Sequence, residues 1–253
     1  MERPPLRKLA LLVEYVGAPY HGFQFQAGVP TVQGDIERAL ARLTGERIRI
    51  VGAGRTDAGV HAEGQVVSFG TDSGLSIEIV VRALNSYVRP DVAVKAATEV
   101  ALDFNARRDA VSREYRYTLI NSATPSPVRE RYAYHVAAPL ATDAMNEACQ
   151  CLLGKHDFAS FTGPTGRRTV REVYKAEISR QNELVFFDIV ANSFLPKQVR
   201  STMGALIRVG LRKLTLGGFT EILEARKPGL AAPVVPAHGL CLMRVNYRRN
   251  IFG

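Results

Sequence analysis

The sequence has few of the residues that build disulfide frameworks and metal sites. Its 253 residues include three cysteines, five histidines and no tryptophan. Cys149 and Cys151 lie two positions apart and Cys241 is remote, which gives neither an even set of pairs nor the paired spacing of a zinc site. The histidines are scattered and contain no H-E-x-x-H spacing. We therefore expect structural thiols in a reducing compartment and no metal site.

Four further absences narrow the class of protein. No apolar run reaches the roughly 18 residues that a membrane helix needs, and the N-terminal segment lacks the apolar stretch of a signal peptide. The phosphate loop G-x-x-x-x-G-K-[ST] and the dinucleotide turn G-x-G-x-x-G are also missing. These absences predict a soluble, cytoplasmic protein that uses no nucleotide cofactor.

The charge is strongly basic, with a net charge of +9 and a pI of about 9.7. Arginine supplies 26 of the 33 basic residues, and its planar fork bonds two phosphate oxygens at once. This balance favours a polyanionic partner, most simply nucleic acid. A genome rich in arginine codons would also enrich alanine, which is common here, so the charge alone favours nucleic acid only modestly.

The pattern of apolar residues predicts an α/β (α+β) fold made of two similar halves. Each half has the β-α-β-β-α-β order of a ferredoxin-like or RRM-like unit, and the two halves together give a mixed, largely antiparallel sheet. The expected domains are 1–106 and 107–253. In the first, we expect strands near 7–16, 47–52, 65–70 and 91–100, with helices at 32–44, between Thr31 and Gly45, and at 77–86, after Ser76.

The second half repeats the order after a strand at 110–120. A long proline-containing loop follows at 121–140. Beyond it we expect a helix from Thr142 to Gly154, strands near 170–180 and 183–191, a long helix from Pro196 to about 213, a short helix near 219–226 and a last strand at 240–247.

The strongest candidate for chemistry is the loop Gly54–Ala62, which reads GRTDAGVHA. Its glycines let the backbone press against a ligand, and Asp57 places one carboxylate there. An aspartate acts as a nucleophile only when it is ionised and held against its target, and the nearby Arg55 favours the ionised form. For an isolated aspartate, an Asx turn would be the more common explanation.

Two other patterns are ambiguous. Arg113, Tyr115 and Tyr117 alternate along a strand and so share one face. The tyrosines could stack on a base or move a proton, although two core tyrosines would give the same spacing. Arg200, Arg208 and Arg212 could form a phosphate stripe, although a solvated helix face is the default interpretation.

The string Gly54–Ala62 resembles the catalytic loop of the tRNA pseudouridine synthase A family. Further segments resemble that family in the same order along nearly the whole chain, and their combination is highly specific. They are Gly22–Gln26, Asp103–Arg107, Tyr115–Tyr117, His156–Phe158, Phe194–Arg200 and Pro236–Leu240.

The resemblance implies two similar α/β domains around a basic cleft, and a homodimer. It also implies isomerisation of uridine to pseudouridine in the anticodon arm of tRNA, at tRNA positions 38 to 40, without a cofactor or a metal. It implies that Asp57 is catalytic, that Tyr115 stacks on the target base, that Arg200 pairs with Asp57 and that Arg55 helps to displace the base. It also suggests RNA contacts for three other residues, Gln24, Arg107 and Arg113. Phe25 departs from the family, which commonly has an arginine there.

Two other functions would fit parts of this pattern. A non-catalytic RNA-binding module would explain the charge and the fold, but not the Arg55–Asp57 loop, and the RRM aromatic signature is missing. A metal-dependent RNA-processing enzyme would need a second carboxylate or a histidine cluster, which the sequence does not offer.

Overall fold

The computed structural model describes residues 6–231 and 233–252. The chain forms two compact units. Unit 1 comprises Met1–Val111 and Leu242–Gly253, as far as these ranges are described, and unit 2 comprises Ser112–Cys241. The sequence placed the whole of 107–253 in the second half. The structure differs because the greater part of the last strand joins unit 1 through pairing with residues far away in the sequence, which no local pattern shows.

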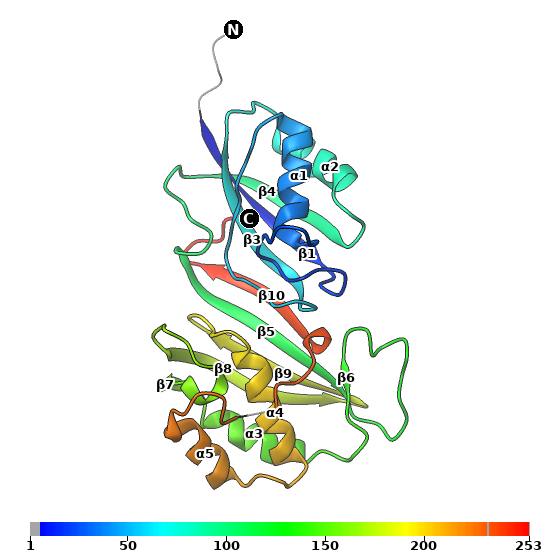
Figure 1. Cartoon of the computed structure of the whole chain (residues 1–253), viewed down its shortest axis with the longest axis vertical. Helices are drawn as coiled ribbons and strands as arrows, with labels where there is room; N and C mark the ends of the chain where they lie inside the picture. Colours follow the sequence, from blue (N-terminus) through cyan, green and yellow to red (C-terminus); the bar gives the residue numbers. More distant parts are fainter. Residues whose placement is uncertain (1–5, 232, 253) are drawn as a thin grey trace. The chain divides into compact units, whose positions relative to one another are not determined.

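Unit 1 is a β-sheet with two helices on one face (Figure 1). Its strand order is β4-β1-β3-β10, and β1 pairs antiparallel with both β3 and β4. The short β2 also pairs with β3. The strands are β1 (Arg7–Tyr15), β2 (Val51–Gly52), β3 (His61–Thr71), β4 (Val92–Val100) and β10 (Leu240–Tyr247).

The helices of unit 1 follow their local signals. Helix α1 (Val32–Thr44) begins after Thr31, whose side chain accepts a hydrogen bond from the N–H of Gly34, and it ends at Gly45, which has a left-handed φ of 75°. Helix α2 (Ile77–Tyr87) begins in the same way after Ser76. Both helices cover the sheet face that carries Leu9, Leu11 and Val13, all of them buried.

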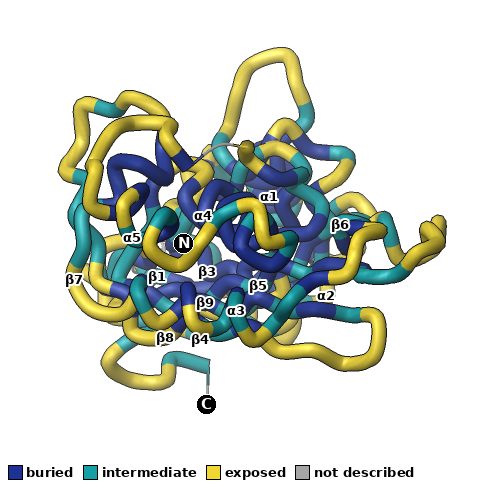
Figure 2. Tube along the Cα trace, turned by 90° about the horizontal axis from the view of Figure 1, so that it is seen from below, coloured by how far each residue is buried: buried dark blue, intermediate teal, exposed yellow. Residues whose placement is uncertain are grey.

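Unit 2 has the strand order β5-β9-β8-β7, and β6 pairs with β5. Strands β8 and β9 form an antiparallel hairpin whose turn holds Asn182 at a left-handed φ of 55°. Buried residues run along these strands, whereas the loops are exposed (Figure 2). The strands are β5 (Ala110–Ile120), β6 (Tyr134–His135), β7 (Gly154–Asp157), β8 (Val170–Gln181) and β9 (Leu184–Ala191).

Two of the helices of unit 2 are shorter than the sequence predicted. Helix α3 (Thr142–Gln150) ends before Gly154, which begins β7. Helix α4 (Gln198–Gly210) lies against α3 and excludes Pro196, because Lys197 before it is left-handed, with φ 61°. Arg212 falls outside α4, so Arg200, Arg208 and Arg212 do not form a stripe along one helix, which was the less favoured of the two interpretations. A third helix, α5 (Leu216–Ala225), and the 3-10 turns η1 (Ala159–Phe161) and η2 (Ala237–Gly239) complete the unit.

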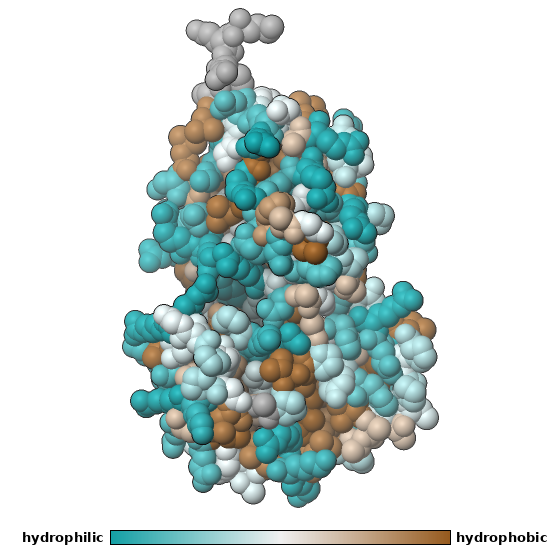
Figure 3. Space-filling model, viewed as in Figure 1, coloured by the Kyte–Doolittle hydropathy of each residue, from teal (hydrophilic) through white to brown (hydrophobic). Residues whose placement is uncertain are grey.

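Among the described residues, no helix is both long and apolar enough to span a membrane. The face of unit 1 seen in Figure 3 is mostly hydrophilic, with hydrophobic residues scattered over it.

Candidate functional site

The loop that carries Asp57 is anchored at its start by a buried glutamine. Gln65 on β3 is fully buried. Its Nε2 donates to the carbonyl oxygen of Gly54 at 2.9 Å, and its Oε1 accepts from the N–H of Gly54 at 3.3 Å. One side chain therefore satisfies both backbone groups of Gly54 and fixes where the chain leaves β2.

A second anchor holds Thr56, which is only 6% exposed. The hydroxyl groups of Tyr15 and Thr56 are 2.8 Å apart, and Gln65 Nε2 lies 3.3 Å from the same tyrosine oxygen. The N–H of Phe23 donates to the carbonyl of Thr56 at 3.1 Å. The residue just before Asp57 is thus held by both its side chain and its backbone.

A tight turn closes the loop directly after this anchor. The N–H of Val60 donates to the carbonyl oxygen of Asp57 at 3.1 Å, and Gly59 adopts a left-handed φ of 81°. The bond that closes this four-residue turn is therefore a backbone bond. This backbone bond fixes the position of Asp57 within the turn.

Two glycines of a neighbouring segment allow the loop to pack closely. A Cβ on Gly17 would lie 2.0 Å from the carbonyl oxygen of Val60, and one on Gly22 would lie 2.9 Å from that of Thr56. Gly22 also has a left-handed φ of 93°. The segment 17–23 therefore supports the Asp57 loop from one side, and its glycines permit backbone-to-backbone contact.

The loop places its charged residues outward. Arg55 is exposed and Asp57 is partly exposed, whereas Thr56 between them is buried. Arg55 forms no ion pair with any residue in the described part of the chain. The loop is therefore a fixed scaffold that holds a carboxylate at the surface of unit 1.

The segment around Gln24 and Phe25 lies beside α1. Gln24 Nε2 donates to Gln33 Oε1 at 2.8 Å, and the same oxygen accepts from the N–H of Phe25 at 2.9 Å. The guanidinium of Arg49 lies over the Phe25 ring, 5.0 Å from its centroid. The family that the sequence resembles commonly has an arginine at position 25. This chain has Phe25 there, and the guanidinium of Arg49 stacks on its ring.

Unit 2 places Tyr115 and Arg200 near the start of α4. Tyr115 on β5 is 8% exposed, and its ring meets the ring of Phe194 edge-on at 5.1 Å. Arg200 lies in the first turn of α4, and its Nε donates to the carbonyl of Val235 at 2.8 Å. That bond fixes the direction of the guanidinium, whose other N–H groups extend beyond it.

Tyr117 links Arg200 to the segment around Pro236. Its hydroxyl donates to the carbonyl of Pro236 at 2.7 Å, and a Cβ on Gly239 would lie 2.7 Å from its ring. Burial raises the pKa of Tyr117, and the charge of Arg200 opposes that rise. Tyr117 is therefore a core residue, whereas Tyr115, on the same strand face, retains a small exposed edge.

The remaining candidates differ in their exposure. Arg107 is exposed, and its N–H donates to Asn105 Oδ1 at 3.0 Å. Arg113 is 8% exposed, and its Nη1 donates to the carbonyl of Asn192 at 2.9 Å. The structure gives Arg113 a supporting contact within unit 2 and leaves little of its surface for RNA.

The residues that hold the Asp57 loop are Tyr15, Thr56 and Gln65, and no sequence motif assigns them that role. The usable signal is a polar glutamine within the apolar strand sequence GQVVSF. The described residues contain no cluster of three or more histidine, cysteine, aspartate or glutamate side chains that could hold a metal ion.

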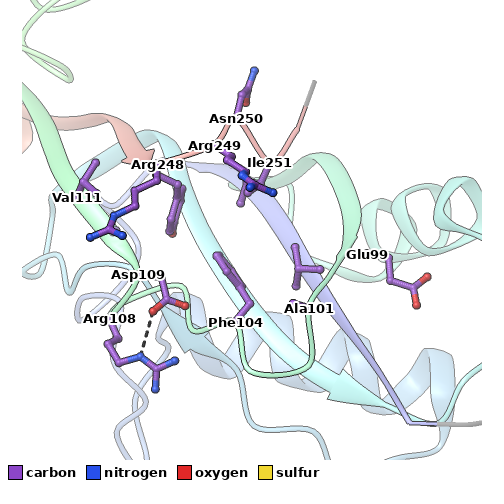
Figure 4. A pocket seen from close by; sticks show the side chains of 13 residues that line it. Glu99, Ala101, Phe104, Arg108, Asp109, Val111, Arg248, Arg249, Asn250 and Ile251 are labelled. Atoms are coloured by element: carbon purple, nitrogen blue, oxygen red, sulfur yellow. Dashed lines mark hydrogen bonds and ion pairs between the residues drawn. The ribbon is translucent and has the colours of Figure 1, made fainter.

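A separate cavity of about 690 Å³ lies in unit 1 between the segment before β5 and the tail after β10 (Figure 4). Phe104 and Tyr247 pack together there with ring centroids 5.3 Å apart. Arg248 and Arg249 come from the tail, and Arg108 is paired with Asp109 at 3.0 Å. No residue of the Asp57 loop lines this cavity.

Comparison with known proteins shows the family of the chain. Residues 11–109 and 148–248 match the family model described as tRNA pseudouridine synthase. The tRNA pseudouridine synthase A of Moorella thermoacetica is 44% identical, covering 94% of this chain and 99% of that protein. The proteins of the same name from a Roseiflexus species and from Acetivibrio thermocellus are 45% and 39% identical, each covering 96% of this chain and 91% and 100% of the relative.

Among solved structures, a Cbf5-Nop10-Gar1 complex contains a chain that is 13% identical, with a TM-score of 0.36, covering 82% of this chain and 45% of that one. That likeness is too slight to add weight to the sequence relatives.

Proposed function

Because the chain belongs to the tRNA pseudouridine synthase family, whose members isomerise uridine to pseudouridine, we propose that it acts on the anticodon arm of tRNA, at tRNA positions 38 to 40. The reaction breaks the bond between the sugar and a ring nitrogen, turns the uracil and rejoins it through carbon. Substrate and product are isomers, so the reaction needs no oxidant and no energy source.

Asp57 is the proposed catalytic residue. The observation that supports this assignment is the tight turn, closed by a backbone bond from Val60 to the carbonyl of Asp57, that holds this residue in a fixed position. An ionised carboxylate in this position can attack the ribose, attack the uracil ring or remove a proton from the sugar. Each of these routes needs a carboxylate that is held in place, which the anchors at Gly54 and Thr56 supply.

Tyr115 and Arg200 are proposed to complete the site from unit 2. A target base must leave its stack to reach a carboxylate, and the ring of Tyr115 offers a surface on which it can lie. Arg200 is proposed to pair with Asp57 and stabilise the carboxylate anion. The bond from Arg200 Nε to the carbonyl of Val235 already fixes the orientation of the guanidinium. Arg55 is exposed beside Asp57 and is proposed to help displace the base.

The proposed RNA contacts beyond the target are Gln24 and Arg107. Arg113 retains this role only as a minor contact, because it is largely buried. The stacked pair of Arg49 and Phe25 presents a guanidinium at the segment where the family commonly has an arginine. We propose that Arg49 replaces that missing charge.

One assay tests the function and separates it from its two rivals. Unmodified tRNA is incubated with the protein in the presence of a chelator, and pseudouridine is measured. Product with undiminished yield supports the synthase. Tight tRNA binding without product would support a non-catalytic module, and product that disappears with the chelator would support a metal-dependent enzyme.

The protein is also proposed to act as a cytoplasmic homodimer. Helices α1 and α2 cover one face of the unit 1 sheet, and we refer here to the other face. The tail after β10 lies beside that other face and borders the cavity of Figure 4. That surface combines aromatic rings with both arginine and carboxylate side chains, so it can complement a second copy of itself. Light scattering at micromolar concentration should give twice the monomer mass, and a monomer mass would exclude this assembly.

A further inference from the structure

Three arginines gather in the loop between η1 and β8 of unit 2. Arg167 and Arg168 are exposed, and Arg171 is partly buried at the start of β8. This loop belongs to none of the segments that resemble the synthase family. We call Arg167, Arg168 and Arg171 the arginine cluster.

Arg171 organises the cluster. Its Nη1 donates to the carbonyl oxygens of Arg168 at 2.8 Å and of Val170 at 2.7 Å. Its Nε is buried and has no hydrogen-bond partner among the described residues. A buried guanidinium N–H without an acceptor is costly, so the loop holds a charged group whose bonding is incomplete.

The cluster is not neutralised within the described part of the chain. None of its three arginines forms an ion pair there. Of the nearby carboxylates, Asp157 accepts from the N–H of Ala159, and Glu172 lies opposite Lys155 in the pairing of β7 with β8. Burial, followed by the charges of Arg168 and Arg167, lowers the pKa of Arg171. The three like charges therefore lie close enough to repel one another, and an anion would relieve that repulsion.

The loop is fixed beside the residues proposed to hold the target base. At its start, the hydroxyl of Thr162 donates to the carbonyl of Pro196 at 2.9 Å. At its end, Thr169 accepts from the N–H of Phe158 at 3.1 Å. Pro196 lies between Phe194, which packs on Tyr115, and Arg200. Unit 2 therefore places the arginine cluster on a loop tied to the start of α4.

We propose that the arginine cluster binds backbone phosphates of the substrate RNA that flank the target nucleotide. This inference rests on the proposed function. Phosphates suit the cluster because each guanidinium can bond two of their oxygens, and because a phosphate contact fixes the position of the RNA without reading its sequence. RNA is favoured over an acidic protein because the whole chain is basic and belongs to a tRNA-modifying family.

The test compares the double variant R167Q/R168Q with a matched control, R82Q/R226Q. Both remove two positive charges from exposed arginines that form no ion pair with a described residue. Pseudouridine formation is followed with full-length tRNA and with an isolated anticodon stem-loop, over a series of salt concentrations. A third variant, R167K/R168K, keeps the charge but loses the planar fork.

For R167Q/R168Q we expect KM to rise on the order of tenfold with both RNAs, kcat to stay unchanged, and the slope of log affinity against log salt to fall by about one to two. The control should match the parent chain, and R167K/R168K should keep the parent slope. An unchanged KM and slope would overturn the inference, as would a loss of kcat alone. A loss seen only with full-length tRNA would also overturn it, because the contact would then lie away from the target. Failure of the parent chain to form pseudouridine would instead contradict the proposed function itself.

Discussion

At the scale of single residues, the decisive question is what Asp57 does apart from holding its own turn. The turn is closed by the backbone carbonyl of Asp57, and the preceding residue is anchored by Tyr15 and Phe23. We therefore expect the loop to keep its fold when asparagine, which has the same size and can still form hydrogen bonds, replaces Asp57.

Asp57→Asn is expected to abolish pseudouridine formation while tRNA binding and folding persist. Loss of an essential carboxylate costs several orders of magnitude in rate, whereas a surface substitution changes the free energy of unfolding by about 0.5 kcal/mol or less. On the same preparation we would measure pseudouridine formation in labelled tRNA, the affinity for tRNA and the thermal unfolding of the protein. Measurable turnover by a folded Asp57→Asn protein would remove Asp57 from the chemistry.

Tyr115→Phe should bind tRNA as well as the parent chain, because the variant keeps the ring that packs against Phe194. Its kcat then reports on the hydroxyl group. A kcat within about threefold of the parent value would assign Tyr115 to stacking, and a loss of about 100-fold would assign it to proton transfer. Weakened tRNA binding in Tyr115→Phe would contradict the placement of the base on this ring.

At the scale of elements, the sequence predicted what local signals decide. Helix α1 begins after Thr31 and ends at Gly45 as expected, because a cap and a left-handed glycine act within a few residues. The start of α4 was missed, because Lys197 adopts a left-handed conformation that a sequence of lysine after proline does not suggest. The loop motif is enough to select Asp57 as the candidate catalytic residue. The role of Gln65 depends on which strands pair, so it could not be predicted from the sequence.

Gln65→Leu should loosen the Asp57 loop. The leucine has a similar size, but it leaves the N–H and carbonyl of Gly54 without their partner, at a cost of about 1–3 kcal/mol for an unsatisfied buried group. We expect a lower free energy of unfolding together with a lower kcat, whereas KM for tRNA should change little. Tyr15→Phe is the graded control, since it removes the bond to Thr56 but keeps both bonds at Gly54. Full activity in Gln65→Leu would show that the anchor does not position the carboxylate.

At the scale of the whole molecule, charge and family lead to the same partner by separate routes. Arginine dominates the basic residues, and the chain belongs to a tRNA-modifying family. The membership of β10 in unit 1 could not be predicted, because its partner β3 lies about 180 residues earlier in the chain, as their bounds His61–Thr71 and Leu240–Tyr247 show. Long-range pairing of this kind leaves no periodic signal in the segment itself.

The affinity for tRNA should therefore fall steeply as salt is raised. Each phosphate that an arginine or lysine neutralises releases bound counterions, so the logarithm of the affinity falls linearly with the logarithm of the salt concentration. With roughly 6–10 phosphate contacts, affinity should drop by a factor of about 10³–10⁵ between 50 and 200 mM salt. Turnover at saturating tRNA should change much less, because the proposed catalytic carboxylate of Asp57 stays in place once the RNA is bound. Dissociation constants and single-turnover rates are measured in parallel at four salt concentrations. A flat affinity would mean that the net charge of +9 does not serve RNA binding, and a rate that falls in step with affinity would place the salt-sensitive contacts at the reacting nucleotide.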